Sequence, residues 1–136
     1  MTADKVAAGA ITLGYAQITS PFTSTVTAPV DVTGLSVTVT IPSGWTRRIE
    51  IEFWAGSWTS SGSAATAYIV EGSTTLSQVR ANTPGNSSTP FTPVKASFVP
   101  TAGTHTYKAQ MNQDVATTTS ITAAPTAPAY ITVVAK

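Results

Sequence analysis

The sequence predicts an all-β fold, a single jelly-roll-like β-sandwich of about eight to ten strands. Charged residues make up only 10% of the chain, against roughly 25% in a typical soluble domain, and threonine and serine supply the missing polarity. Threonine is β-branched and suits the pleated, half-buried surface of a sheet. Short strand-like segments are separated by turns rich in Gly, Pro, Asn and Ser, and no helical period extends over about a dozen residues.

The strongest strand signal lies in residues 35–54, LSVTVTIPSGWTRRIEIEFW. Apolar side chains occupy every second position in both halves of this segment: Leu35, Val37, Val39, Ile41, Ile49, Ile51 and Phe53. Successive side chains of a strand point to opposite faces, so each half is a strand with one buried face. Pro42-Ser43-Gly44 has turn chemistry. We therefore expect a hairpin, or a corner between two sheets, that carries the densest apolar face of the chain.

The other strands are predicted from the same signals. In chain order they are expected at residues 13–19, 22–27, 66–71, 74–81, 94–99, 104–111, 116–123 and 129–135. The Thr/Ala composition of residues 116–123 favours an edge strand. Residues 56–65 are expected to form a flexible Gly/Ser loop. Residues 82–93, which hold three prolines, are expected to form the longest irregular loop.

Length and charge restrict the function classes. The 136 residues suit one domain, predicted at residues 13–136, after a short N-terminal arm at residues 1–12 that is either flexible or bound to a partner. A net charge of +1 gives no field to attract nucleic acid or an anionic membrane, so neither is an expected partner. There is no cysteine, which excludes disulfides and thiolate chemistry. The N-terminal apolar run is too broken for a signal peptide, and no run is long enough to span a membrane as a helix, so we expect a chain made and used without export.

The carboxylates do not predict catalysis. Glu50 and Glu52 lie two apart on one strand face, which places them roughly 7 Å apart, a separation that glycosidases use between acid and base. Ion-pair partners are expected for them instead, from Arg47, Arg48 and Lys95, either across strands or between subunits. No phosphate-binding loop, dinucleotide fingerprint, zinc motif or nucleophile elbow occurs. The sequence therefore predicts a protein that is not an enzyme and that holds no cofactor or metal.

Aromatic residues allow two interpretations. Trp54, Trp58 and Tyr68 are candidate glycan contacts, because the two tryptophans flank the predicted Gly/Ser loop at the end of a strand, where sandwiches place binding loops. The favoured alternative is that Trp45 and Trp54 cap the ends of the core and fill a subunit interface, where tryptophan is enriched.

Two parts of the sequence resemble a known family. APVDVTGLSVTVTIPSGWTRRIEIEFWA with AYIVEGSTTLSQ, and GTHTYKAQM with PAYITVVAK, are similar to the compact jelly-roll domains, of tumour-necrosis-factor/C1q-like fold, in virion proteins of actinobacteriophages. Those domains commonly trimerise. The resemblance implies a homotrimeric capsid decoration protein, located on the virion surface after assembly in the host cytoplasm, with the major capsid protein as partner. A minor tail or receptor-binding protein is the alternative, with a host surface glycan as a further partner. The absence of a long preceding fibre segment favours decoration.

The resemblance carries no catalytic residues, and it directs attention to an interface between copies. Inward or interface positions are predicted for Phe53, Tyr107, Tyr130 and Ile131. His105, the one histidine of the chain, has no carboxylate near it in sequence and is predicted to be a structural or interface residue. On a symmetry axis it would make assembly sensitive to pH.

Overall fold

The computed structural model describes residues 11–62, 64–83, 87–115 and 117–136. Twelve strands account for the secondary structure of this part of the chain, and it contains no helix long and apolar enough to cross a membrane. The strands are β1 (Ile11–Ile18), β2 (Phe22–Ser24), β3 (Val30–Ile41), β4 (Ile49–Trp54), β5 (Ser57–Ser60), β6 (Ala64–Glu71), β7 (Thr74–Asn82), β8 (Ser87–Pro90), β9 (Val94–Phe98), β10 (Gly103–Gln113), β11 (Thr119–Ile121) and β12 (Ala129–Ala135).

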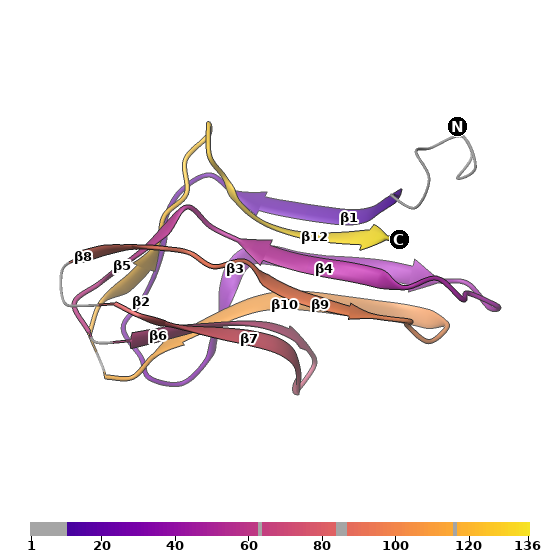
Figure 1. Ribbon diagram of the computed structural model, residues 1–136, viewed down its shortest axis with the longest axis horizontal. Helices are drawn as coiled ribbons and strands as arrows, with labels where there is room; N and C mark the ends of the chain where they lie inside the picture. The colour runs from indigo at the N-terminus through magenta and orange to yellow at the C-terminus, as the bar shows by residue number, and fades with distance from the viewer. Residues whose placement is uncertain (1–10, 63, 84–86, 116) are drawn as a thin grey trace.

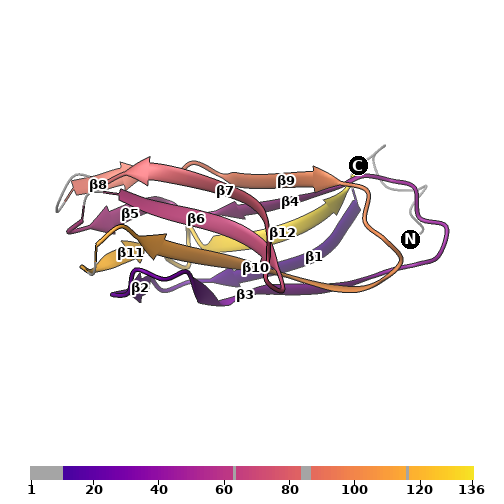
Figure 2. The same cartoon turned by 90° about the horizontal axis from the view of Figure 1, so that it is seen from below.

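Eight of these strands form two four-stranded antiparallel sheets that pack face to face (Figures 1 and 2). The first sheet has the order β1-β12-β4-β9, and the second sheet has the order β3-β10-β6-β7. Consecutive strands of the two main sheets alternate between them except for β6 and β7, which pair as neighbours in the second sheet, and this order is that of a jelly roll. The predicted fold class is confirmed. The β3–β4 connection runs from the second sheet to the first, so it is a corner between sheets and not a hairpin.

The four remaining strands form an end sheet, β2-β11-β5-β8, at one end of the sandwich (left in Figure 1). Each of the four crossings between the main sheets at this end contributes one strand to it: β2 lies between β1 and β3, β5 between β4 and β6, β8 between β7 and β9, and β11 between β10 and β12. The count of twelve strands therefore exceeds the predicted eight to ten because crossing segments pair with one another.

The core lies between the two main sheets and follows the two-residue alternation of the strands. On β12 every odd-numbered residue from Ala129 to Ala135 is buried, and the even-numbered residues are half-buried. The predicted apolar face of residues 35–53 is buried at all seven positions. Two large aromatic pairs fill one end of the core, Phe53 with Phe91 at 5.0 Å and Trp58 with Phe91 at 5.1 Å between ring centroids.

Three predicted segments differ from the structure. The expected Gly/Ser loop at residues 56–65 contains β5, and the expected irregular loop at 82–93 contains β8. The expected edge strand at 116–123 is β11, which is paired on both sides, with β2 and β5. These short strands have partners far away in sequence, and periodicity within a segment does not report such partners.

The predicted arm, residues 1–12, lies outside the described residues except for Ile11 and Thr12, which begin β1. β1 pairs with β12 and also lies against β3 of the second sheet. Gly14 permits this close approach, because a Cβ added there would lie 2.1 Å from Cγ1 of Val37.

Candidate functional site

The outer face of the first sheet carries three aromatic side chains from three neighbouring strands, Tyr15 on β1, Tyr130 on β12 and Trp54 on β4. We call them the aromatic row. Tyr130 lies opposite Trp54 in the strand register. The ring of Tyr130 stacks on that of Tyr15 at 5.8 Å and on that of Trp54 at 5.7 Å. Tyr15 is 52% exposed, so the row reaches solvent on the side of the edge strand β1.

Polar groups fix the two tyrosines of the row. The Tyr130 hydroxyl donates to the Glu52 carboxylate at 2.6 Å, and Glu52 pairs with Lys95 at 3.5 Å. The Tyr15 hydroxyl donates to the Gln17 side-chain carbonyl at 2.8 Å. Burial, and then the hydrogen bond to Glu52, raise the pKa of Tyr130 to about 12. Tyr130 therefore stays protonated around neutrality, and its orientation on the sheet is set by a permanent donor.

Glu50 and Glu52 both have partners. Lys95 is the partner of Glu52, as predicted, and Lys136 lies 3.7 Å from Glu50. Within the described part of the chain, Arg47 and Arg48 pair with neither glutamate. Both donate to backbone carbonyls, Arg47 to Lys136 and Arg48 to Ser97, at 2.7 Å in each case.

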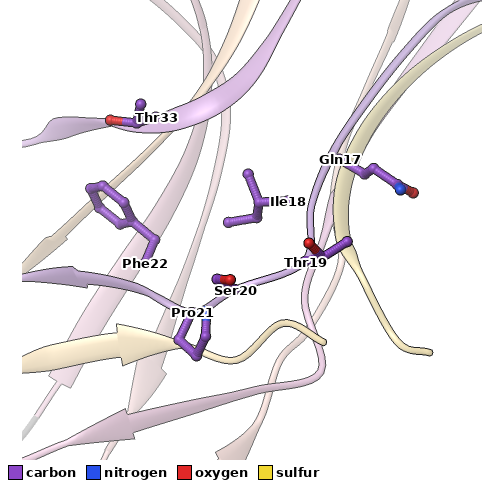
Figure 3. Close-up of a pocket in the computed structure, with 7 residues that line it drawn as sticks. All are labelled: Gln17, Ile18, Thr19, Ser20, Pro21, Phe22 and Thr33. Atoms are coloured by element: carbon purple, nitrogen blue, oxygen red, sulfur yellow. The ribbon is translucent and has the colours of Figure 1, made fainter. Parts of the chain in front are cut away.

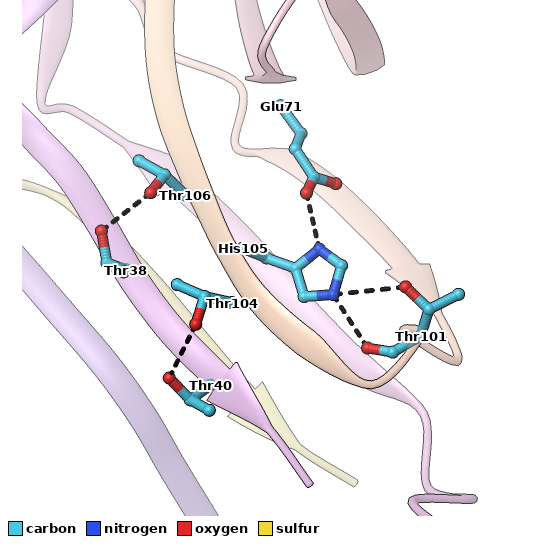
Figure 4. A network of polar contacts seen from close by, with 7 residues as sticks. All are labelled: Thr38, Thr40, Glu71, Thr101, Thr104, His105 and Thr106. Carbon is cyan, nitrogen blue, oxygen red and sulfur yellow. Dashed lines mark hydrogen bonds and ion pairs between the residues drawn. The ribbon is translucent and has the colours of Figure 1, made fainter. Parts of the chain in front are cut away.

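A second polar cluster surrounds His105 at the start of β10, at the end of the sandwich opposite the end sheet (Figure 4). Its Nδ1 lies 2.6 Å from a carboxylate oxygen of Glu71, the last residue of β6, and its Nε2 lies 2.8 Å from the carbonyl oxygen of Thr101. The ring stacks on Tyr107 at 5.9 Å with 3° between the planes. On the outer face of the second sheet nearby, hydroxyl groups pair across β3 and β10, Thr38 with Thr106 at 2.9 Å and Thr40 with Thr104 at 3.2 Å.

An open pocket of about 390 Å³ lies between the β1–β2 turn and β3, lined by Gln17, Ile18, Thr19, Ser20, Pro21, Phe22 and Thr33. Figure 3 shows the side chains of Ile18 and Phe22 turned toward its centre and that of Gln17 turned away. None of the lining side chains carries a charge, so the pocket offers no acid, base or nucleophile pair.

Three of the five predicted interface residues are core residues. Phe53, Tyr107 and Ile131 are fully buried between the sheets, so of the two predicted positions, inward or interface, they occupy the inward one. Tyr130 belongs to the outer aromatic row. His105 lies at the end of the sandwich, with its side chain 14% exposed.

The predicted glycan contacts are also separated. Trp58 is 1% exposed and packs against Phe91, so its indole cannot stack on a sugar. Tyr68 lies on the second sheet, where its hydroxyl donates to Asn112 at 2.7 Å. Only Trp54 lies in the aromatic row.

Sequence reasoning missed two residues of these sites. Tyr15 occupies an outward position of β1, and an aromatic side chain at a position that alternation assigns to solvent is a signal that could have identified it. Glu71 lies 34 residues before His105, so no local pattern connects them. In the described ranges no group of three or more His, Asp or Glu side chains is arranged to hold a metal ion.

No protein-family model matches the sequence, and no curated protein matches it. Among solved structures the chain is similar to the Eiger TNF from S. frugiperda, with a TM-score of 0.53 and 13% identity over 94% of this chain and 93% of that one. The likeness is one of fold.

A part of the insecticidal delta-endotoxin Cry8Ea1 from Bacillus thuringiensis is also similar, with a TM-score of 0.50 and 16% identity over 85% of this chain. The match covers 19% of the toxin, so the chain spans about a fifth of its length. A carbohydrate-binding module of lichenase 5A from Cellvibrio mixtus has a TM-score of 0.42 and 13% identity, with 90% of this chain and 97% of the module covered.

Proposed function

We propose that the protein is a non-enzymatic structural protein of a bacteriophage virion, and that it assembles as a homotrimer which decorates the outer shell by binding the major capsid protein. The resemblance of two sequence segments to phage jelly-roll domains supports the virion role. The jelly-roll topology agrees with that resemblance.

The aromatic row is the observation that carries the assembly part of the proposal. Aromatic side chains are enriched at protein interfaces, and Tyr15 alone leaves half of a large ring in water. The two ring faces of Tyr130 are covered by Tyr15 and Trp54, so the row offers ring edges and hydroxyl groups for packing against another protein surface.

Charge favours a second copy as the occupant of this face. Glu52 and Glu50 are paired with Lys95 and Lys136, so the acidic residues beside the row are balanced within the same chain. The net charge of +1 gives little repulsion between copies. Closed symmetry is the norm for homo-oligomers, and a trimer is the closed form that the resemblance implies.

Light scattering after size exclusion tests the assembly. The parent chain is expected at about 42 kDa, three times 14.0 kDa. Tyr15→Ser is expected to lower the mass toward that of one chain. Val99→Ser is the matched control, since Val99 is similarly exposed, at 47%, but lies outside the row, and it should leave the mass unchanged. A parent chain that stays monomeric up to high concentration would contradict the trimer.

The virion position needs a separate measurement. In virions that contain the chain, a decoration protein is present in amounts comparable to the major capsid protein, whereas a minor tail protein is present in few copies. Quantitative mass spectrometry of purified particles distinguishes these positions, and absence from the particles would contradict the virion role.

The aromatic row also favours one other function, glycan binding, in a form that differs from the predicted one. Trp54 and Tyr15 lie at the two ends of the row, and Glu52 and Gln17 provide polar groups beside it, a combination common in ligand sites. A glycan array, or a pull-down with host surface material, tests this function. Binding by a monomeric parent that is lost in Tyr15→Ser but kept in Val99→Ser would favour glycan recognition over assembly.

A further inference from the structure

We propose that His105 and Thr101 form a pH-operated latch on the β9–β10 turn. The protonated His105 ring donates to the Thr101 carbonyl and so holds the turn. The neutral ring loses this hydrogen bond and accepts one from the Thr101 hydroxyl in its place. The latch does not depend on the proposed virion function, because all of its contacts lie within one chain.

The geometry defines the protonated state. An ionised carboxylate and a backbone carbonyl can only accept hydrogen bonds. Nδ1 of His105 faces the carboxylate of Glu71 at 2.6 Å, and Nε2 faces the carbonyl of Thr101 at 2.8 Å. Both ring nitrogens must therefore carry a proton, and His105 is an imidazolium in this arrangement.

The same residue offers an alternative partner for the neutral ring. The hydroxyl of Thr101 lies 3.4 Å from Nε2, and a hydroxyl can donate to a nitrogen that has lost its proton. The neutral ring keeps its Nδ1 proton for Glu71, because the bond to a carboxylate is the stronger of the two. Loss of the proton from Nε2 then leaves two acceptors facing each other at the Thr101 carbonyl, so that contact breaks and the turn moves to bring the hydroxyl closer.

Among the groups that surround the His105 ring, Glu71 is the charged one, and it favours the protonated form of the ring. On β10 itself the neighbour is Tyr107, whose pKa is raised to about 12 by burial, so it is neutral. The residue opposite on β3 is Val39, and Thr101 in the β9–β10 turn is uncharged. The hydrogen bond to Glu71, followed by that to the Thr101 carbonyl, raises the pKa of His105 above its ordinary value of 6.5.

The sign of the pH dependence follows from this direction. A group whose pKa is raised on folding stabilises the folded state fully below its unfolded pKa, and the stabilisation is lost as the pH rises through the folded pKa. The latch is therefore closed below about pH 6.5 and opens as the pH rises through the folded pKa of His105. No cysteine and no second histidine titrate in this range.

NMR titration of the single histidine tests the latch directly. In the parent the ring resonance is expected to titrate with a midpoint above 6.5, and the backbone amides of Val99, Thr101 and Ala102 are expected to shift with the same midpoint. Glu71→Gln should lower the midpoint, because it removes the charge that favours the imidazolium. Thr101→Val should raise it, because the neutral ring loses its hydroxyl partner while the carbonyl remains.

Two controls separate the latch from a general structural effect. Thr101→Ser keeps the hydroxyl and should restore the parent midpoint. Tyr107→Phe keeps the stacked ring and should leave the midpoint unchanged. A parent midpoint at or below 6.5, turn amides that do not follow the ring, or a Thr101→Val midpoint that does not rise would each overturn the proposal.

Discussion

Removal of the Tyr107 hydroxyl should stabilise the protein. Tyr107 is fully buried, and its hydroxyl makes no hydrogen bond to any of the described residues. A buried hydroxyl without a partner costs about 1–3 kcal/mol of desolvation. Phenylalanine retains the ring, which packs edge-on against Phe98 at 6.2 Å and stacks on His105. Tyr107→Phe therefore removes the unfavourable group and leaves the packing in place.

The free energy of unfolding is expected to rise by about 1–2 kcal/mol. This is the lower part of the desolvation range, because the smaller side chain leaves a small void where the oxygen was. For a domain of this size the gain corresponds to a rise in melting temperature of roughly 3–7 °C. Urea unfolding should show a higher midpoint with an unchanged slope, since the surface exposed on unfolding is nearly the same.

Tyr130→Phe is the matched control, since it makes the same chemical change where the hydroxyl has a partner. The Tyr130 hydroxyl donates to the charged Glu52 carboxylate, and its loss should lower stability by about 1–2 kcal/mol. The two substitutions should thus have opposite signs. A Tyr107→Phe variant that is less stable than the parent by about 1 kcal/mol or more would refute the reasoning, because it would mean that the hydroxyl makes a favourable contact.

Two further substitutions test the core and the contact between the sheets. Phe53→Ala removes a fully buried ring that packs against Phe91 and should lower the free energy of unfolding by about 3–5 kcal/mol, measured by urea denaturation; a loss under about 1 kcal/mol would show that the ring is not in the core. Gly14→Ala places a Cβ against Val37 and should cost about 1–3 kcal/mol through overpacking, visible as a lower melting temperature; an unchanged value would mean that β1 does not lie so close to β3.

The long strands were predictable because their inward faces are continuous. Residues 35–41 and 49–53 alternate without interruption, and residues 129–135 are apolar or aromatic except at Thr132. The structure buries the odd-numbered residues of each segment. These strands are long enough that a two-residue period in their apolar residues would rarely arise by chance. The two-sheet architecture follows from them, since each strand has one face to bury.

The end sheet and the tryptophan were not predictable in this way. Trp58 lies on a four-residue strand in a Gly/Ser-rich segment, where composition favours an exposed loop. Its burial comes from Phe91 and from the pairing of β5 with β8 and β11. Such contacts join segments that lie tens of residues apart in sequence. The pattern of residues within one segment therefore does not predict them.

The functional clusters show the same division. Tyr130 and Trp54 could be assigned to strands, but only the order β1-β12-β4 places them beside Tyr15. The Glu71 carboxylate, which favours the protonated form of His105, lies on another strand of the second sheet. Strand order therefore decides which side chains become neighbours, and the sequence pattern decides only the face on which each one lies.

The position of β12 has a consequence for the way the protein folds. This strand is the last of the described elements in the chain, yet it lies inside the first sheet, between β1 and β4. Until Ala129–Ala135 have been synthesised, β1 has no partner in that sheet, and the edge of β4 that faces away from β9 is unpaired. The nascent chain must therefore keep its first strand unpaired while the rest is made. Completion of the sandwich follows synthesis of Ala129–Ala135, and pairings between strands so far apart in sequence are slow to form.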